Sequence, residues 1–377
     1  MREKICIIGI GKLGLCFALN LEKKGYEVIG IDVSQNYVDS LAAKTFVSDE
    51  PNVTEMLQEA VHFHPTTDFS RAFESKVIFV LVATPSLPDG KYDHSQIHDV
   101  LSHLLAFGEL TSNISINRTD LIIGCTTMPG YCEYAQQRLN SFMRTRGNDC
   151  GFFISYNPEF IAQGTIIRDQ LNPDMILIGE ADEAIGNKLQ EIYTKLVDNS
   201  PKFSRMSPTE AEIAKIALNC FLTTKISFAN MVGDVVLSSG GRPDVVLSAI
   251  GQDSRIGGKY LKYGFGFGGP CFPRDNRAFG IHADKVGVKP LIPVATDESN
   301  SLHLDYQAKN YSEEKSVTFD YVTYKPESTM LTESQQLALA VKLADNGWNV
   351  TINEREKVIE EVKKIHGNKF TYTVRNS

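Results

Sequence analysis

The feature that most constrains the fold of this chain is a set of three glycines near the N-terminus. Gly9, Gly11 and Gly14 follow the apolar run Ile5–Ile10 and open an amphipathic stretch at Leu13–Lys24. A strand, a glycine turn and a helix in this order form the phosphate-binding start of a dinucleotide-binding βαβ unit. The helix N-terminus adds unpaired N–H groups and a partial positive charge that suit a pyrophosphate. The pattern predicts a Rossmann-type domain.

An acidic residue lies where the second strand of this unit is expected to end. Asp32 closes the run Glu27–Asp32, 18 residues after Gly14. A carboxylate there accepts hydrogen bonds from ribose hydroxyls and repels a 2′-phosphate, which favours NAD over NADP. The alternative is a glycine-rich turn followed by a helix-capping Asp. We therefore predict that NAD is bound by Gly9, Gly11, Lys12, Leu13, Gly14, Asp32 and two hydroxyls at strand ends, Thr84 and Thr127.

Strand-like and helix-like runs continue to alternate after this unit. The strand-like runs are mostly apolar throughout, as in parallel strands covered on both faces, and they lie at Lys76–Ala83, Leu121–Thr127, Phe152–Tyr156 and Met175–Gly179. A helical pattern covers Asp182–Leu196. The fold class predicted for residues 1–206 is therefore α/β, with a doubly wound Rossmann-type sheet.

The pattern changes at Ser207. Ser207-Pro208-Thr209-Glu210 is a capping box, and helix-compatible sequence then extends to about Ser238. Such a long helix predicts a central helical domain over residues 207–311 that forms the core of a homodimer. Further helices are expected from Pro243 and over Lys289–Tyr311. Residues 312–377 predict a shortened α/β domain with the elements Ser316–Val322, Glu333–Asn346, Asn349–Asn353, Arg355–His366 and Lys369–Val374.

Composition excludes several classes of protein. With 38 Lys and Arg against 46 Asp and Glu, the net charge of −8 gives no bulk attraction to nucleic acid or an anionic membrane. We expect no uninterrupted membrane-spanning run and no signal peptide. The seven cysteines include no C-x-x-C pair, which argues against a metal site or a disulfide framework and favours a cytoplasmic location. An anionic substrate therefore needs a local cluster of cations.

The most informative stretch is the glycine-rich segment Gly264–Asp275. Its glycines allow the backbone to wrap closely around a ligand. Cys271 follows at the expected start of a helix, where a thiolate is stabilised, and Arg274 and Asp275 come directly after it. The alternative is a buried structural cysteine in a glycine-rich turn.

The sequence GFGGPCFPRD within this segment resembles GFGGSCFPKD, the active-site segment of the UDP-glucose/GDP-mannose 6-dehydrogenase family. Other motifs occur in the family's order, and the resemblance is clear to about residue 300 and faint beyond it. In the segment Gly264–Asp275, which we call the Cys loop, the sequence is nearer to that of the UDP-glucose enzymes than to that of the UDP-N-acetylmannosamine branch. The matching segments are Ile7–Gly14, Val82–Pro85, Thr126–Gly130, Asn157–Phe160, Glu212–Asn219 and Arg255–Gly257.

The resemblance implies a four-electron oxidation of a sugar-nucleotide primary alcohol to a carboxylate with two NAD, for polysaccharide biosynthesis. Cys271 would form a thiohemiacetal and then a thioester, which an ordinary alcohol dehydrogenase does not need. Lys215 and Asp275 would stabilise the oxyanion and handle a proton, and Glu159 would assist thioester hydrolysis. Thr127 would orient the water, and Asn219, one helical turn after Lys215, would bond the sugar hydroxyls.

The resemblance also implies which residues bind the substrate. The cations before the glycine loop, Arg255, Lys259 and Lys262, would hold the diphosphate. Arg255 is expected to reach across a dimer interface. The full predicted substrate set is Glu159, Phe160, Ile161, Ala162, Gln163, Lys215, Asn219, Arg255, Tyr260, Leu261, Lys262, Gly264, Gly268 and Lys325.

Three positions depart from the family pattern. Gln163 stands where the family usually has a second acid, and Arg274 replaces the lysine of the Cys loop; both are also expected to contact NAD. Thr332 replaces an arginine before Glu333-Ser334, and the sequence after Lys325 is shorter than the usual C-terminal domain.

These observations favour UDP-glucose as the substrate and UDP-glucuronate as the product. The same chemistry on UDP-N-acetylhexosamine or GDP-mannose is an alternative. A two-electron hydroxyacid-type dehydrogenase is another, although it would not need Cys271. A third is a binding protein that has lost turnover.

Overall fold

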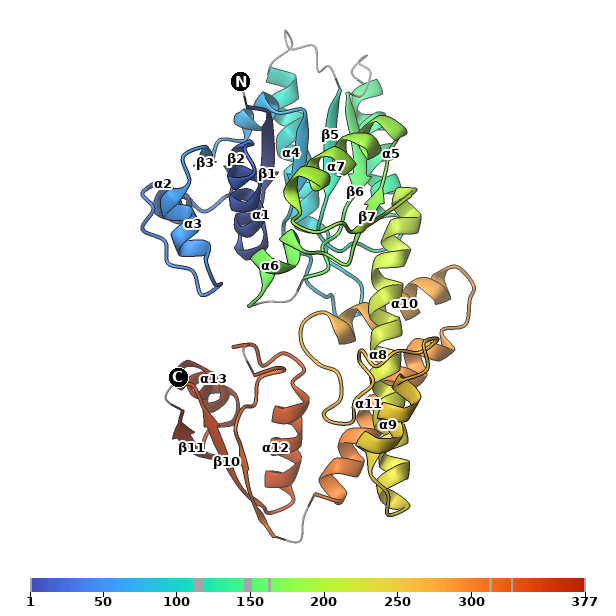
Figure 1. Cartoon of the computed structure of the whole chain (residues 1–377). Helices are drawn as coiled ribbons and strands as arrows, with labels where there is room; N and C mark the ends of the chain where they lie inside the picture. The colour runs from blue at the N-terminus through green and yellow to red at the C-terminus, as the bar shows by residue number, and fades with distance from the viewer. Residues whose placement is uncertain are drawn as a thin grey trace. The chain divides into compact units, whose positions relative to one another are not determined.

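The computed structural model describes residues 2–110, 118–145, 151–161, 164–311, 314–326 and 328–375. The chain divides into two compact units, Met1–Lys215 and Ile216–Ser377 (Figure 1). Each unit has its own sheet and its own hydrophobic core.

The first unit is built on an eight-stranded sheet of order β3-β2-β1-β4-β5-β6-β7-β8. The first six strands in this order are parallel, which is the dinucleotide-binding arrangement. β7 pairs antiparallel with β6, and β8 pairs parallel with β7. The bounds are β3 (Phe63–Thr66), β2 (Glu27–Ile31), β1 (Lys4–Ile8), β4 (Val77–Val80), β5 (Thr119–Ile123), β6 (Phe152–Tyr156), β7 (Met175–Gly179) and β8 (Lys202–Met206).

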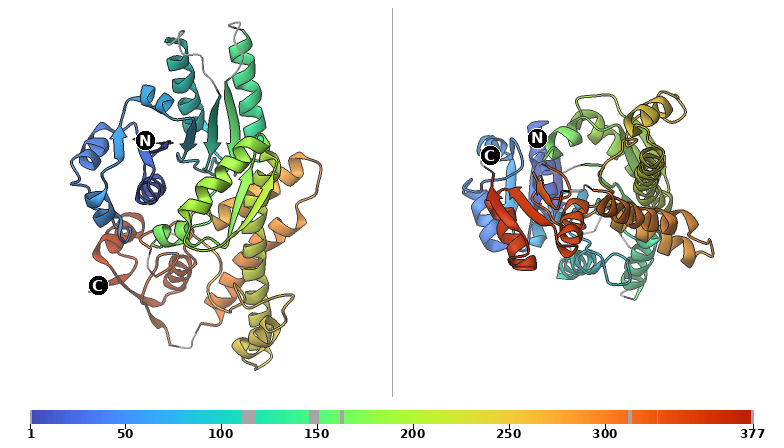
Figure 2. Two further views of the ribbon diagram at one scale, coloured as in Figure 1. Left: turned by 45° about the horizontal axis from the view of Figure 1, so that its top comes forward. Right: turned by 90° about the horizontal axis from the view of Figure 1, so that it is seen from below.

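Helices cover both faces of this sheet (Figure 2). Along β1, Ile5 and Ile7 belong to the core on one face, whereas Cys6 and Ile8 belong to the core on the other. This double burial explains why the strands are apolar throughout, and it confirms the predicted doubly wound α/β sheet. The helices are α1 (Lys12–Lys23), α2 (Gln35–Ala42), α3 (Val53–Glu59), the 3₁₀ helix η1 (Phe69–Glu74), α4 (Ser95–Leu110), α5 (Tyr131–Arg144), α6 (Ile166–Leu171) and α7 (Glu183–Leu196).

The predicted strands are present but generally end earlier than expected. The strand predicted over Ile5–Ile10 stops at Ile8, because the chain turns at Gly9. The one predicted over Leu121–Thr127 likewise covers only Thr119–Ile123. The apolar residues beyond each strand end belong to the turns that form the carboxyl edge of the sheet, where ligands of such folds bind.

Helix α8 (Pro208–Ser238) crosses the division between the units and begins at the predicted capping box. The backbone N–H of Ser207 donates to Glu210 Oε2 at 2.8 Å, and that of Glu210 to Ser207 Oγ at 3.4 Å. In the described part of the chain α8 is the one helix long and apolar enough to cross a membrane. Its buried polar side chains Glu212, Asn219 and Thr223 bond other parts of the protein, as in a core helix.

The second unit joins helices to a small parallel sheet of order β11-β10-β9. Phe319, Leu343, Ile352 and Val362 lie in the core of this sheet. The predicted small C-terminal α/β region is thus present. Its elements are α9 (Pro243–Gly251), α10 (Phe272–Lys285), α11 (Leu291–Lys309), β9 (Ser316–Phe319), α12 (Gln335–Asp345), β10 (Asn349–Glu354), α13 (Glu356–His366) and β11 (Thr371–Val374).

Candidate active site

The glycine turn of the first unit has the shape that a pyrophosphate requires. Gly9 has a φ of +90°, and a Cβ there would lie 2.6 Å from the carbonyl oxygen of Leu81. A Cβ at Gly14 would overlap the carbonyl oxygen of Gly9. A Cβ at Gly11 would instead project into open space at the start of α1, with no atom within 4 Å. The turn therefore fits the pyrophosphate of NAD, with the backbone at Gly11 open to close approach.

Side chains around this turn are held by hydrogen bonds, an ion pair and core packing. Asp32, just after β2, accepts a hydrogen bond from the backbone N–H of Ser34 through Oδ1 at 3.1 Å. Lys12 pairs with Asp49 at 3.0 Å, and Leu13 packs against the core. The sequence reasoning missed Tyr37, whose hydroxyl donates to the carbonyl of Ile10 at 2.8 Å. Tyr37 thereby holds the turn from α2.

The turn that follows β5 is organised by a buried carboxylate, to which the sequence reasoning assigned no role. Glu212 is fully buried and accepts hydrogen bonds from Thr127 Oγ1 at 2.9 Å, Gly130 N at 2.6 Å and Cys132 N at 2.9 Å. Burial raises the pKa of Glu212, and these hydrogen bonds oppose the shift. The carboxylate also faces the N-terminus of α5, where negative charge is favourable.

This arrangement defines what the two threonines do. The Thr127 hydroxyl is buried and donates to Glu212, so an ordering role toward a water would use its acceptor lone pairs. The Thr84 hydroxyl is also buried and donates to the carbonyl of Thr126 at 2.8 Å. His94, which the sequence reasoning also missed, accepts from Met128 N at 3.2 Å. The two predicted hydroxyls thus lie on adjacent loops, after β4 and β5, which the bond from Thr84 to Thr126 joins.

Glu159 and Lys215 come together within the first unit. Lys215 is buried, and its Nζ donates to the backbone carbonyl of Glu159 at 2.9 Å and lies 4.3 Å from the centre of the Phe160 ring. The Tyr193 hydroxyl donates to Asn157 at 2.6 Å and lies 3.4 Å from Glu159 Oε1. Burial raises the pKa of Glu159 to about 7, and the nearby charge of Lys215 opposes this.

These contacts show how the predicted catalytic Lys215 is placed. Its ammonium group is held against the Phe160 ring and the carbonyl of Glu159. Tyr193 had no signal in the sequence, because it reaches Glu159 from a separate helix. Ile161 packs against the core, and the predicted ligands Ala162 and Gln163 lie outside the described residues.

The Cys loop belongs to the second unit. Cys271 is exposed and is the N-cap residue of α10, as predicted, where the helix N-terminus favours a thiolate. Asp275, in the first turn of α10, is 1% exposed and accepts from Asn219 Nδ2 at 2.6 Å and from Arg274 Nε at 3.1 Å. Three predicted site residues therefore form one polar group beside Cys271, of which Asp275 and Asn219 are buried and Arg274 is partly buried.

The contacts of Asn219 and Arg274 bear on their predicted roles. The Asn219 amide nitrogen was expected to reach sugar hydroxyls, and in this structure it donates to Asp275. Arg274 was expected to contact NAD, and its Nε also donates to Asp275. Asp275 thus receives two donors, which fix its carboxylate in the first turn of α10.

Segments distant in sequence surround the glycines of the Cys loop. The backbone N–H of Gly269 donates to the carbonyl of Thr332 at 3.0 Å, and a Cβ on Gly269 would lie 2.6 Å from the Tyr324 ring. A Cβ on Gly268 would overlap the carbonyl oxygen of Glu333. The loop that departs from the family pattern at Thr332 therefore packs directly on the Cys loop.

The predicted phosphate-binding cations lie on an exposed loop before these glycines. Arg255 is 86% exposed on its side chain and pairs with Asp253 at 2.7 Å. Lys262 is exposed, and Lys225 of α8 donates to the carbonyls of Ile256 and Gly257 at 2.9 and 3.0 Å. Lys225 is a support for this loop that the sequence reasoning missed. Of the other predicted ligands, Tyr260 is exposed, Leu261 is buried, and Lys325 lies 5.7 Å from the Tyr324 ring centre.

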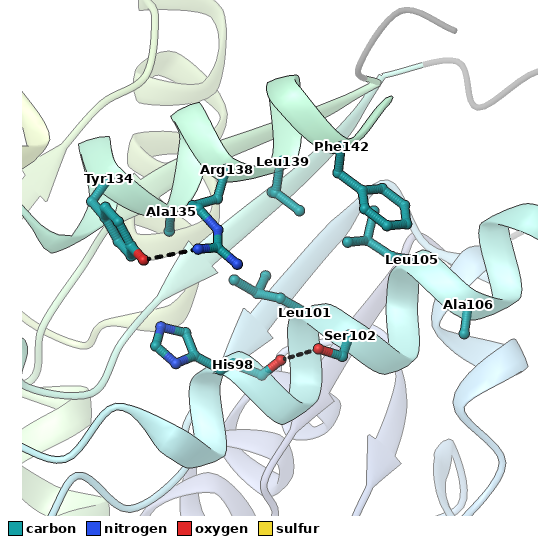
Figure 3. Close-up of a pocket in the computed structure, with 10 residues that line it drawn as sticks. All are labelled: His98, Leu101, Ser102, Leu105, Ala106, Tyr134, Ala135, Arg138, Leu139 and Phe142. Atoms are coloured by element: carbon teal, nitrogen blue, oxygen red, sulfur yellow. Dashed lines mark hydrogen bonds between the residues drawn. The ribbon is translucent and has the colours of Figure 1, made fainter. Parts of the chain in front are cut away.

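A separate groove of about 590 Å³ lies between α4 and α5 in the first unit (Figure 3). Apolar side chains such as Leu101 and Leu139 line it together with His98 and Arg138. None of the predicted cofactor, substrate or catalytic residues contributes to its lining.

The parallel sheet, the glycine turn and Asp32 together define an NAD-dependent dehydrogenase of the Rossmann class. Sequence models of the UDP-glucose/GDP-mannose dehydrogenase family match this chain twice, through the NAD binding domain at residues 3–197 and the central domain at residues 209–301. The chain belongs to this family. It is therefore an NAD-dependent nucleotide-sugar 6-dehydrogenase.

Curated relatives include enzymes with different substrates. GDP-mannose 6-dehydrogenase of Pseudomonas aeruginosa is 29% identical over 97% of this chain and 83% of that enzyme. UDP-glucose 6-dehydrogenase AglM of Haloferax volcanii is 29% identical over 92% of this chain and 82% of that enzyme. The solved UDP-glucose dehydrogenase of Pyrobaculum islandicum is 27% identical, with a TM-score of 0.84, over 99% of this chain and 86% of that one.

Proposed function

We propose that this enzyme oxidises UDP-glucose to UDP-glucuronate, in a four-electron reaction that passes through a thioester on Cys271. The observation that carries the proposal is the exposed Cys271 at the N-terminus of α10, next to the buried Asp275. A two-electron alcohol dehydrogenase needs no nucleophile, whereas retention of an aldehyde for a second oxidation does. The preference for UDP-glucose is supported by the spelling of the Cys loop and by the similarity to the Pyrobaculum islandicum enzyme.

Each step of the proposed reaction has a candidate residue in this chain. NAD, when bound, accepts a hydride in each oxidation, from alcohol to aldehyde and from thiohemiacetal to thioester. Cys271 Sγ forms the bond to the aldehyde carbon. Lys215 is a buried cation suited to stabilising the oxyanion, and Asp275 is suited to taking the alcohol proton. In the last step a water oxygen bonds to the thioester carbon as the bond to Sγ breaks, and Glu159 takes the water proton.

Glu159 is suited to this last step because of its surroundings. With its pKa raised to about 7, a substantial fraction of the carboxyl group is ionised near neutral pH, and that fraction is a stronger base than an ordinary carboxylate. Lys215 holds the adjacent carbonyl of Glu159, which fixes the segment that carries the base.

We further propose a cytoplasmic homodimer that serves polysaccharide biosynthesis. The apolar residues Phe221, Phe228, Met231 and Val235 are exposed at helical spacing on α8 in a single chain, so a second chain would have an apolar surface to cover. Arg255 would then supply its charge to a nucleotide bound across the interface. Light scattering of the purified protein tests this, and a monomeric mass would contradict it.

The direct test is the stoichiometry of NADH formation with a panel of sugar nucleotides. We expect two NADH per UDP-glucose, and loss of product with Cys271→Ser while the variant still binds NAD. A better yield from GDP-mannose or a UDP-N-acetylhexosamine would overturn the substrate assignment but keep the chemistry. One NADH per sugar, unchanged in Cys271→Ser, would overturn the thioester mechanism. Binding of the sugar nucleotide without any NADH would identify a protein that has lost turnover.

A further inference from the structure

The start of the Cys loop is held at its backbone by side chains from α8 and α11, all within the second unit. Asn230 accepts from Gly264 N at 3.0 Å. Asn300 bonds both backbone groups of Phe267, accepting from its N–H at 2.9 Å and donating to its carbonyl at 3.0 Å. Gly264 and Phe267 belong to the segment that leads to Cys271. We call the side chains that hold it, Asn230, Asn300, His303 and Gln307, the loop clamp.

His303 is the ionisable member of this clamp. It is 3% exposed, and its Nδ1 lies 2.8 Å from Asp234 Oδ2 while its Nε2 lies 2.7 Å from the carbonyl oxygen of Gly264. Gln307 donates to the same carbonyl at 3.1 Å. Asp234 in turn accepts from the Tyr263 hydroxyl at 2.8 Å, and the Tyr263 ring packs edge-on against His303.

Both nitrogens of this buried ring face oxygen atoms that can only accept. A neutral imidazole carries one N–H, so either neutral tautomer would place a nitrogen lone pair against an oxygen less than 3 Å away. With a hydrogen on each nitrogen, the ring is a cation paired with the Asp234 carboxylate, and both hydrogen bonds form. A buried charge of this kind persists because it is paired and hydrogen-bonded.

We propose that His303 is a positioning residue that, as an imidazolium bonded to Asp234 and Gly264, fixes the start of the loop carrying Cys271. This inference rests on the proposed role of Cys271. On deprotonation the remaining hydrogen stays on Nδ1, because the carboxylate of Asp234 is the stronger acceptor. Loss of the Nε2 hydrogen would therefore break the bond to Gly264 and loosen the start of the loop.

Titratable groups from neighbouring segments face His303. Asp234 comes from α8, and Tyr263 comes from the loop; among the described residues Tyr306 of α11 also influences Tyr263. Burial and the Asp234 carboxylate raise the pKa of Tyr263, so its hydroxyl keeps the hydrogen that it donates to Asp234.

The first experiment measures the protonation of the ring in the unmodified enzyme with NAD bound. Nitrogen-15 NMR of histidine-labelled protein should show both nitrogens of one buried histidine protonated at neutral pH. The Nε2 proton should be lost on alkaline titration together with faster amide exchange at Phe265 to Phe267. A single-protonated ring at neutral pH would overturn the proposal. This measurement does not depend on turnover or on the role of Cys271.

The second experiment compares His303→Gln with the matched control His98→Gln, which replaces an exposed histidine on α4. Alkylation of Cys271 by iodoacetamide and kcat for NADH formation are measured across pH. A glutamine keeps one donor but does not titrate, so we expect kcat to fall about tenfold or more, as when a catalytic group is misplaced. We expect kcat of the wild-type enzyme to decline at alkaline pH and kcat of His303→Gln to decline less steeply.

His98→Gln should behave as the wild-type enzyme in both assays. An alkaline decline of equal steepness in His303→Gln and the wild-type enzyme would overturn the role of His303. Failure of the proposed function would instead appear as unchanged stoichiometry in Cys271→Ser. If His303→Gln does not fold, the NMR titration alone decides the proposal.

Discussion

The two glycine-rich loops of this enzyme are shaped by different kinds of neighbour. In the turn at Gly9–Gly14, the close contacts come from the turn itself and from Leu81, just after β4. In the Cys loop, the close contacts at Gly268 and Gly269 come from Glu333 and Tyr324, more than fifty residues along the chain. The first loop is therefore completed by its own residues and by the chain after the adjacent strand of its sheet, whereas the second is completed by the segment around Tyr324 and Glu333.

This difference bears on what the sequence shows of each loop. A glycine turn that contacts itself and the adjacent strand of the same sheet has a spacing that any chain with the same fold must keep. For a loop that a distant segment completes, the sequence shows where the glycines lie but not which contacts require them. The departure at Thr332 lies in that distant segment, and the backbone carbonyl of Thr332 accepts a hydrogen bond from Gly269 in the Cys loop.

The largest expected effect is on the first loop. Gly14→Ala should lower the free energy of unfolding by about 3 kcal/mol or more, because its Cβ would overlap backbone that cannot move independently. Gly11→Ala is the matched control for folding, since its Cβ meets no atom. It should unfold as the wild-type protein but bind NAD about tenfold more weakly, about 1.4 kcal/mol. Urea denaturation and calorimetric NAD titration measure both. Equal stabilities for the two variants would contradict the geometry of the turn.

On the second loop we expect a smaller loss of stability with a larger loss of turnover. Gly268→Ala should cost about 1–3 kcal/mol, because the Glu333 segment can shift to relieve the overlap. That shift moves the loop carrying Cys271, so kcat should fall while NAD affinity is kept. Gly258→Ala, whose Cβ meets no atom, is the stability control. If Gly268→Ala is destabilised but keeps its kcat, the contact between the C-terminal segment and the Cys loop does not influence turnover.

Glu159, the base in the proposed mechanism, lies in the first unit. Glu159 has its pKa raised by burial to about 7, so hydrolysis of the thioester should increase as the pH rises through about 7. The same shift favours the protonated form in the folded state. Its contribution to stability is complete below the ordinary value of 4.5 and is lost as the pH rises to about 7.

Glu159→Gln separates these two consequences. It should accumulate a covalent adduct on Cys271, detectable by mass spectrometry, and should remove this part of the pH dependence of unfolding. Stability is compared at pH 5 and pH 8 by urea denaturation. If Glu159→Gln keeps the wild-type pH dependence and forms no adduct, Glu159 is not the base.

The smallest effect concerns the ion pairs beside the two loops. Arg277 of α10 bonds Asp297 at 2.9 Å and Glu333 at 2.8 Å, whereas Lys12 has the exposed Asp49. Arg277→Gln should cost about 1 kcal/mol and Lys12→Gln less than about 0.5 kcal/mol, because exposed pairs are weak. The midpoints of urea denaturation test the order. A larger cost for Lys12→Gln would show that the second loop is not held from Glu333.

The amino-acid sequence by itself determined the Rossmann start of this enzyme, its preference for NAD, the long helix after Ser207 and the helix that begins at Cys271. These features depend on spacing along one segment, so periodicity, capping and glycine positions were enough. Only the tertiary structure decided the partners of the buried groups: Glu212 with Thr127, Lys215 with Phe160, Asp275 with Asn219, and His303 with Gly264. Each joins segments that are separate in the sequence, and a buried polar group must find a partner wherever the fold brings one.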